Sequence, residues 1–271
     1  RRQPMTIRIL FRFHKNYEVC IQNLTIIKSL NPDIKIDGLY GGEDKIEDIP
    51  NSLKSLFDTL WTIPLDDPYY KWKNADLCVR WWYKEQGKAL DFSHIIIWEW
   101  DLLALKPFEE IYPILKPDHN YATIFGDYKY AKEIDWHWIS QTYFYDLECM
   151  EDSFKKKGYK FNLETLSFGL MGGTVLCRKF LENYIREHVS SYSNDELRLS
   201  VYSQAYHIPF LDNGIRSTPN NLLDANGKLF GEKEINEVLK DGGKVIHPIR
   251  ELITNLEQKI STKKDKPEDN Q

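Results

Sequence analysis

The chain has 271 residues, of which 42% are hydrophobic and 28% are charged, and its formal net charge is −5. These proportions are those of an ordinary globular protein and exclude a disordered or fibrous chain. The acidic balance argues against the basic surface with which proteins bind nucleic acids. The length suits one large α/β domain, or a nucleotide-binding half joined to a smaller half.

No apolar run approaches the roughly 20 residues of a membrane-spanning helix, and the sequence opens with no signal-peptide pattern. Since the first residue is Arg1 rather than Met, we expect one domain of a longer protein. The four cysteines are widely separated and match no zinc or redox spacing, which predicts buried thiols in a cytoplasmic protein. A lumenal enzyme with two disulfides is the alternative.

The first hundred residues alternate between strand and helix patterns. This order predicts a parallel sheet with right-handed crossovers, in which ligands bind at the carboxyl ends of the strands. In chain order, hydrophobic periodicity and turn residues predict a strand at 6–13, a helix at 17–30, a strand at 34–40, a helix at 51–59, a strand at 61–63 and a helix at 73–86.

The next strand, residues 94–98, reads His-Ile-Ile-Ile-Trp, the near-continuous apolar pattern of a central strand covered on both faces. It ends at Glu99-Trp100-Asp101. Residues two apart on an extended chain project to the same side, so Glu99 and Asp101 can face one site. Paired carboxylates suit Mg²⁺ or Mn²⁺, whose other positions are filled by waters and substrate phosphates. The alternative is that acidic residues end a strand because loops are wet.

In this respect the sequence resembles the GT-A glycosyltransferases, whose DXD motif ends a central strand at this position; here the motif reads Glu-Trp-Asp. The resemblance implies an α/β fold with a Rossmann-type, mostly parallel sheet flanked by helices. It implies a single domain over residues 1–260, with the nucleotide-sugar half at about 5–120 and a smaller acceptor half at about 121–250. It further implies that Asp101 binds a metal, that Glu99 reaches the ribose or a metal-bound water, and that Trp100 borders the donor.

The second half is less regular. An aromatic stretch at 121–145 precedes a predicted strand at 167–177 and predicted helices at 178–188 and 195–205. Gly172-Gly173 interrupts the strand; it either lets an acceptor approach the backbone or forms a β-bulge. The tail at 261–271 has no apolar residue and is expected to be disordered or a linker.

Ser193-Asn194-Asp195-Glu196 resembles the acidic helix start at which inverting GT-A enzymes keep their catalytic base. Glu196 is the favoured base and Asp195 the substitute, and a helix N-terminus favours the ionised form. The alternative is a capping box, in which Glu196 only satisfies the first amides of the helix.

Residues 244–250 resemble the C-terminal segment in which many GT-A enzymes complete the metal shell with a histidine and contact phosphate with a basic residue. The resemblance assigns His247 to the metal and Lys244 or Arg250 to the diphosphate, and imidazole is a competent manganese ligand. A surface histidine beside a Pro-terminated strand is the alternative.

Three weaker features complete the candidate site. Arg12-Phe13-His14 ends the first strand, where the resemblance places the nucleotide base. Asp76 and Arg80 share one helical face and either border the donor site or form an ion pair. Trp136 and Trp138 form either an aromatic platform for an acceptor sugar or core packing.

The residues and the resemblance together predict a Mn²⁺- or Mg²⁺-dependent transfer of a sugar from a UDP or GDP sugar to a hydroxyl of a glycan or glycosylated acceptor. An inverting mechanism with Glu196 or Asp195 as the base is favoured, and a retaining enzyme, which needs no such base, is the alternative. A sugar nucleotidyltransferase is one alternative, but it should carry a glycine-rich loop where this chain reads Arg-Phe-His-Lys-Asn. A non-catalytic protein that binds carbohydrate with tryptophan and tyrosine alone is the other.

Overall fold

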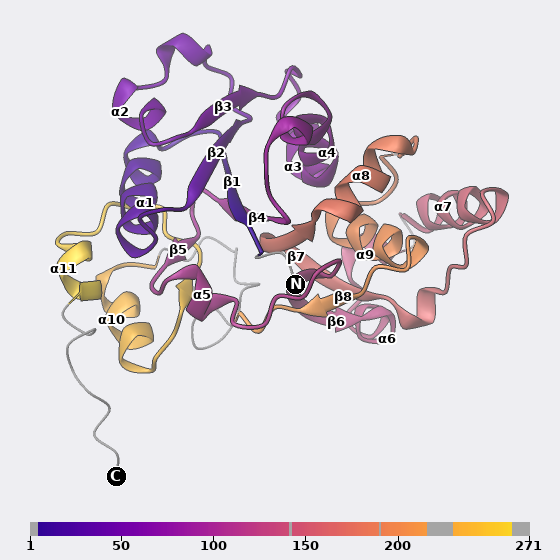
Figure 1. Ribbon diagram of the computed structural model, residues 1–271. Coiled ribbons are helices and arrows are strands. Elements are labelled where there is room, and N and C mark those ends of the chain that lie inside the picture. The colour runs from indigo at the N-terminus through magenta and orange to yellow at the C-terminus, as the bar shows by residue number, and fades with distance from the viewer. Residues whose placement is uncertain (1–4, 141–142, 190, 216–229, 262–271) are drawn as a thin grey trace.

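The computed structural model describes residues 5–140, 143–189, 191–215 and 230–261 (Figure 1). Nearly all of the expected tail at 261–271 lies outside these ranges. Within them, no helix is both long and apolar enough to cross a membrane. All four cysteines are free thiols, and of these Cys20, Cys78 and Cys177 are buried, as predicted.

A seven-stranded sheet forms the centre, in the order β3-β2-β1-β4-β7-β6-β8. Every neighbouring pair is parallel except those of β7, which runs antiparallel to both β4 and β6. The predicted mostly parallel sheet flanked by helices is thus confirmed. The strands are β1 (Ile7–Phe13), β2 (Lys35–Tyr40), β3 (Thr59–Thr62), β4 (His94–Glu99), β6 (Asn120–Asp127), β7 (Ser167–Cys177) and β8 (Phe210–Asp212).

Helices cover both faces of the sheet, with α1 on one side and α3 and α4 on the other (Figure 1). The α-helices of the described residues are α1 (Tyr17–Leu30), α2 (Asn51–Lys54), α3 (Pro68–Lys73), α4 (Ala75–Glu85), α5 (Phe108–Ile111), α6 (Tyr128–Glu133), α7 (Phe144–Lys156), α8 (Arg178–Arg186), α9 (Asp195–Ala205), α10 (Glu232–Lys240) and α11 (Leu256–Ser261).

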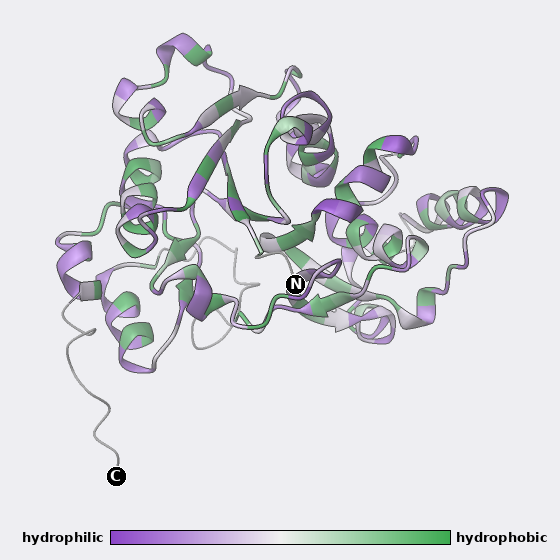
Figure 2. Ribbon diagram, in the orientation of Figure 1, coloured by the Kyte–Doolittle hydropathy of each residue, from purple (hydrophilic) through white to green (hydrophobic). Residues whose placement is uncertain are grey.

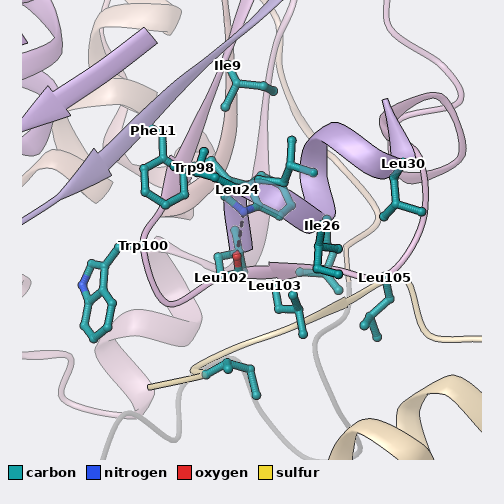
Figure 3. Packing of buried hydrophobic residues seen from close by; sticks show 14 of the residues in the cluster. Ile9, Phe11, Leu24, Ile26, Leu30, Trp98, Trp100, Leu102, Leu103 and Leu105 are labelled. Carbon is teal, nitrogen blue, oxygen red and sulfur yellow. Dashed lines mark hydrogen bonds between the residues drawn. The ribbon is translucent and has the colours of Figure 1, made fainter. Parts of the chain in front are cut away.

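Successive side chains of each strand point to opposite faces of the sheet, and this creates two hydrophobic cores. Ile9 and Trp98 point to the face covered by α1, whereas Leu10 and Ile97 point to the face covered by α4, α8 and α9. In Figure 2, where residues are coloured by hydropathy, hydrophobic residues lie along the central strands and on the sides of the helices that face the sheet. Figure 3 shows the first core, where Trp98 lies among side chains from β1 and α1.

The structure differs from the predicted helices in two places. The helix expected at 51–59 ends at Lys54, and β3 begins at Thr59, where β-branched and aromatic residues suit a strand. The helix expected at 73–86 corresponds to α4, but a further helix that was not predicted, α3, precedes it and ends before Asn74, whose side chain donates to the Tyr70 carbonyl of α3. Asp67 begins α3 by accepting from the Tyr70 amide, with Pro68 in the first turn.

A second, two-stranded sheet pairs β5 (Leu103–Ala104) antiparallel with β9 (Val245–Ile246). Two further backbone hydrogen bonds extend this contact, from the Leu105 amide to the Lys244 carbonyl (2.9 Å) and from the Ile249 amide to the Asp101 carbonyl (2.7 Å). This pairing, the C-terminal clip, holds residues 244–249 against the chain that follows β4.

Candidate active site

A cavity of about 440 Å³ opens at the carboxyl ends of β1 and β4. Its walls come from β1, α3, the end of β4, β7, the start of α9 and the segment after β9. Of the residues that the sequence singled out, the cavity is lined by Arg12, His14, Glu99, Trp100, Asp101, Trp138, Gly172, Asp195, Glu196, His247 and Arg250. The lining excludes Phe13, Asp76, Arg80, Trp136, Gly173 and Lys244.

Glu99 and Asp101 both line the cavity, but each carboxylate has its own cationic partner. Glu99 accepts a hydrogen bond from Arg12, its neighbour across the β1–β4 pairing, at 2.6 Å. Asp101 accepts from the Nε of Arg250 at 3.0 Å, and its Oδ1 lies 3.3 Å from the Nε2 of His247. The acidic pair therefore faces one cavity, as predicted, with two separate ion pairs.

These environments shift the two acids in opposite directions. Burial raises the pKa of Glu99, and the nearby charge of Arg12 offsets the rise only in part. Burial would also raise the pKa of Asp101, but the hydrogen bonds and charges of His247 and Arg250 outweigh it and hold that pKa below its usual value. Asp101 is thus the more strongly ionised of the two.

The C-terminal clip explains how His247 and Arg250 reach Asp101. Pairing of β9 with β5 places the residues after Ile246 beside the carboxyl end of β4. Lys244 lies before this point, and its amino group donates to the Glu110 carbonyl at 2.6 Å. The assignment of Lys244 to the diphosphate is therefore corrected: of the two basic residues considered, Arg250 is the one in the cavity.

Asp101 and His247 fit two positions of a divalent-cation shell. At metal–ligand distances of about 2.1 Å, neighbouring ligands of an octahedral ion lie about 3 Å apart, close to the 3.3 Å between Asp101 Oδ1 and His247 Nε2. Within the described residues, no group of three or more His, Cys, Asp or Glu side chains could hold a metal. The donor set thus suits an ion that takes its remaining ligands from water and substrate phosphate, while Glu99, the other carboxylate of the expected pair, is hydrogen-bonded to Arg12.

The acidic helix start forms another wall. Asn194 caps α9, since its side-chain oxygen accepts from the Leu197 amide at 3.2 Å. Glu196 accepts from the side chain of Asn194 at 3.2 Å, so the capping box with Ser193 is not formed. Both Asp195 and Glu196 line the cavity.

Burial raises the pKa of Glu196 to about 7. Burial, with the charges of Asp76 and Glu196, raises the pKa of Asp195 well above its usual value. The expectation that the helix N-terminus keeps both acids ionised is therefore wrong, because desolvation outweighs the helix dipole here. A carboxyl group that titrates near neutrality is well suited to accept a proton from a hydroxyl.

Asp76 and Arg80 have roles different from those expected. Asp76 is buried and forms a two-pronged ion pair with Arg198, at 2.6 and 2.9 Å, and it also accepts from Tyr184. Arg80 donates to the backbone carbonyls of Tyr184 and Glu187. Neither borders the cavity, and the ion pair between them is not formed.

Arg198 is a residue that sequence reasoning missed. Its guanidinium also donates to the Tyr192 and Ser193 carbonyls and to the Asn74 side chain. It thereby joins the start of α9, which lines the cavity, to the start of α4. An arginine within Leu-Arg-Leu, on a helix buried nearly all round, was the available signal.

The aromatic wall differs from the expected platform. Trp138 lines the cavity, whereas Trp136 packs against Phe125 and Phe168 in the core. The partner of Trp138 at the rim is Trp72, with ring centroids 5.9 Å apart. Trp72 is 63% exposed and was not singled out from the sequence.

Gly172 and Gly173 form a bulge, because Tyr121 pairs with Val175 whereas Thr123 pairs with Leu170. Gly172 lines the cavity, and a Cβ there would lie 3.2 Å from the Cγ of Glu99. Gly173 has a φ of +78° and faces away from the cavity lining, with its carbonyl accepting from Tyr112. Only Gly172 can therefore meet a bound molecule.

A smaller cavity of about 180 Å³ shares Arg12, His14, Glu99 and Trp72 with the first. Phe13 lines this second space, together with apolar side chains at the ends of β2 and β3. Burial, with the positive charges of Lys15 and Arg12, lowers the pKa of His14 to about 4. The imidazole is thus neutral near pH 7 and can donate or accept a hydrogen bond there.

No family model matches the chain, and no curated protein matches it. Among solved structures it is similar to the galactosyltransferase LgtC, solved with donor and acceptor sugar analogues, at 14% identity and a TM-score of 0.43, covering 78% of this chain and 76% of that chain. It is similar to the bifunctional glycosyltransferase WbbM at 10% identity and a TM-score of 0.45, covering 90% of this chain and 45% of that chain. A glycosyltransferase involved in glycosylation of the major capsid of PBCV-1 matches at 10% identity and a TM-score of 0.44, covering 96% of this chain and 98% of that chain. These neighbours are glycosyltransferases, the class that the sequence resembles.

Proposed function

We propose that this chain is a glycosyltransferase that moves a sugar from a nucleoside diphosphate sugar to a hydroxyl acceptor. One observation carries the proposal. Segments far apart in the sequence bring a carboxylate–histidine pair, an arginine and two carboxyl groups with raised pKa values to one cavity at the carboxyl end of the sheet. This combination suits a reaction in which a diphosphate leaves and a hydroxyl loses a proton.

In the proposed site, Asp101 and His247 hold Mn²⁺ or Mg²⁺. A cation bound there would supply Lewis-acid stabilisation of the leaving diphosphate. Arg250 adds a permanent positive charge on the same side. Glu99, neutralised by Arg12, shapes the floor of the cavity beside Gly172.

Glu196 is the proposed base for inverting transfer. Its pKa of about 7 leaves a substantial ionised fraction at neutral pH, and it then accepts the proton of the attacking hydroxyl. Asp195, whose pKa burial raises well above its usual value, accepts from the Glu196 amide at 2.9 Å, which fixes the position of its carboxyl group. The smaller cavity, between β1, β2 and Trp72, takes the nucleotide base in this proposal.

The two rival functions predict different ligands. A sugar nucleotidyltransferase would bind nucleoside triphosphates, and a carbohydrate-binding protein would bind glycans without a cation. The lining of the cavity, with its ionisable groups next to Trp72 and Trp138, favours the transferase.

The test combines ligand binding with turnover. Thermal-shift measurements with UDP, GDP and dTDP sugars, with and without Mn²⁺, should show stabilisation by one donor class that depends on the cation. Asp101→Ala should abolish cation-dependent turnover of that donor and leave the fold intact, whereas Asp152→Asn, at an exposed position on α7, should keep full activity. Wild-type turnover by Asp101→Ala would remove the assignment.

A further inference from the structure

The two arginines that pair with the strand-end acids are not equivalent. Arg12 and Glu99 are neighbours on adjacent strands of the central sheet, and Arg12 also reaches the Lys71 carbonyl. Arg250 lies outside any helix or strand, in the segment that follows β9. The Arg12–Glu99 pair is thus held by the sheet, whereas Arg250 is attached to the site through a loop.

Arg250 uses only part of its hydrogen-bonding capacity. Its Nε donates to Asp101, and its two terminal amino groups make no hydrogen bond to any other described residue. Its side chain is 35% exposed and lines the cavity, in contrast to 14% for Arg12. A guanidinium with two free donor groups in a cavity is suited to bind an oxyanion such as phosphate.

Asp101, by contrast, has no free oxygen. Oδ2 accepts from Arg250, Oδ1 faces His247, and the side chain is 8% exposed. A cation placed between Oδ1 and His247 would therefore lie beside the guanidinium that holds Oδ2 of the same carboxylate, and the two positive charges would repel each other.

The charges lead to the same conclusion. Asp101 and Arg250 cancel each other, so a divalent cation alone would add two positive charges beside a guanidinium. A diphosphate alone would add two or more negative charges beside a carboxylate. Bound together, cation and diphosphate nearly cancel, and Arg250 exchanges one oxyanion partner for another.

We propose that Arg250 is an exchangeable counter-ion of Asp101, which holds the carboxylate while the donor is absent and moves to the diphosphate when donor and cation bind. This inference rests on the proposed function. It makes the binding of cation and nucleoside diphosphate mutually dependent: each binds weakly alone and strongly in the presence of the other.

The test measures Mn²⁺ binding directly, from the electron paramagnetic resonance signal of the free ion, on the full chain without and with UDP or GDP. Arg250→Gln should bind Mn²⁺ alone roughly 10- to 100-fold more tightly than the wild type, because a charge-assisted hydrogen bond no longer competes for Asp101. Lys15→Gln is the matched control, since Lys15 also lines the cavity but lies over the ring of Trp100. It should change the affinity by less than about threefold, as expected for the loss of one screened charge.

Nucleotide should then raise the Mn²⁺ affinity of the wild type by roughly tenfold or more, and that gain should shrink in Arg250→Gln. Arg250→Lys, which keeps the charge but lacks the planar fork, should fall between the two. It also serves as the second variant if Arg250→Gln does not fold.

The possible negative results distinguish a failure of the exchange by Arg250 from a failure of the proposed cation site. If Arg250→Gln binds Mn²⁺ no more tightly than Lys15→Gln while Asp101→Asn abolishes binding, the exchange is wrong and the metal site stands. If neither the wild type nor any variant binds Mn²⁺ with UDP or GDP present, both the exchange and the proposed cation are overturned.

Discussion

Replacing Asp76 by alanine would leave the guanidinium of Arg198 charged inside the core without its carboxylate. The side chains of this pair are 1% and 0% exposed, and two hydrogen bonds of 2.6 and 2.9 Å join them. Burial would lower the pKa of Arg198, but the charge and hydrogen bonds of Asp76 raise it, so the guanidinium does not lose its charge. Removing one partner of a buried ion pair costs about 3–5 kcal/mol, and we expect a loss of this size in the free energy of unfolding.

A double-mutant cycle measured by urea unfolding tests this value. Arg198→Met should cost a similar amount, because it leaves Asp76 and the Tyr192 and Ser193 carbonyls without their donor. The double variant should lose little more than either single variant, which gives a coupling energy of about 3 kcal/mol. Glu182→Ala, which breaks an exposed pair with Arg178, is the control and should cost less than about 1 kcal/mol.

A second measurement connects this pair to the site. Because Arg198 joins the starts of α4 and α9, Asp76→Ala should also lower transferase turnover at temperatures where the variant remains folded. A loss of less than about 1 kcal/mol in Asp76→Ala, or strictly additive energies in the cycle, would refute the reasoning.

Four further predictions concern the site and the strand beside it. Transfer by the wild type should rise between pH 6 and pH 8 as Glu196 ionises, since the pKa of this group is about 7, and Glu196→Gln should lose transfer at every pH; a turnover–pH profile that is flat over this range would exclude this base. Because folding raises the pKa of Glu196, the folded state binds this proton more tightly than the unfolded state does. Protonated Glu196 therefore stabilises the fold at low pH, and this stabilisation is lost as the pH rises to about 7. In urea unfolding, the free energy of unfolding of Glu196→Gln should rise relative to that of the wild type over this pH range. Gly173→Ala should be more destabilising than Gly158→Ala, because both residues have a positive φ but only Gly173 would place a Cβ against Ile215 and Tyr112; equal losses in urea unfolding would show that crowding is unimportant there. Lys244→Ala should leave the affinity for donor unchanged in calorimetry, because the amino group of Lys244 donates to the Glu110 carbonyl outside the cavity. A severalfold loss of donor affinity would show instead that Lys244 belongs to the site.

Much of the fold could be predicted from periodicity. The helix expected at 17–30 and the strand expected at 167–177 match α1 and β7, because each has a long apolar pattern with clear breaks at its ends. The short helix α3 was not predicted, since its two ends depend on the side chains of Asp67 and Asn74 rather than on hydrophobic spacing.

Some residues of the candidate site could be predicted from their position along the chain. Asp101 and Glu196 could be selected because each stands at the end of an expected element, and His247 because residues 244–250 resemble the C-terminal segment of GT-A enzymes. Their partners could not be selected, because the pairing of Arg12 with Glu99 depends on strand register, and that of Arg250 with Asp101 depends on the β5–β9 contact. The raised pKa values at the start of α9 depend on burial by distant segments, which local sequence does not report.

The C-terminal clip also determines at what point during synthesis the chain could first bind its donor. Asp101 obtains Arg250 from a position 149 residues further along the chain. A nascent polypeptide could pair the strands up to β7 on the ribosome and still have neither His247 nor Arg250 beside that carboxylate. Premature binding of donor by an incomplete chain is therefore disfavoured, and cleavage between α10 and β9 should abolish the proposed transfer while leaving every strand of the central sheet uncut.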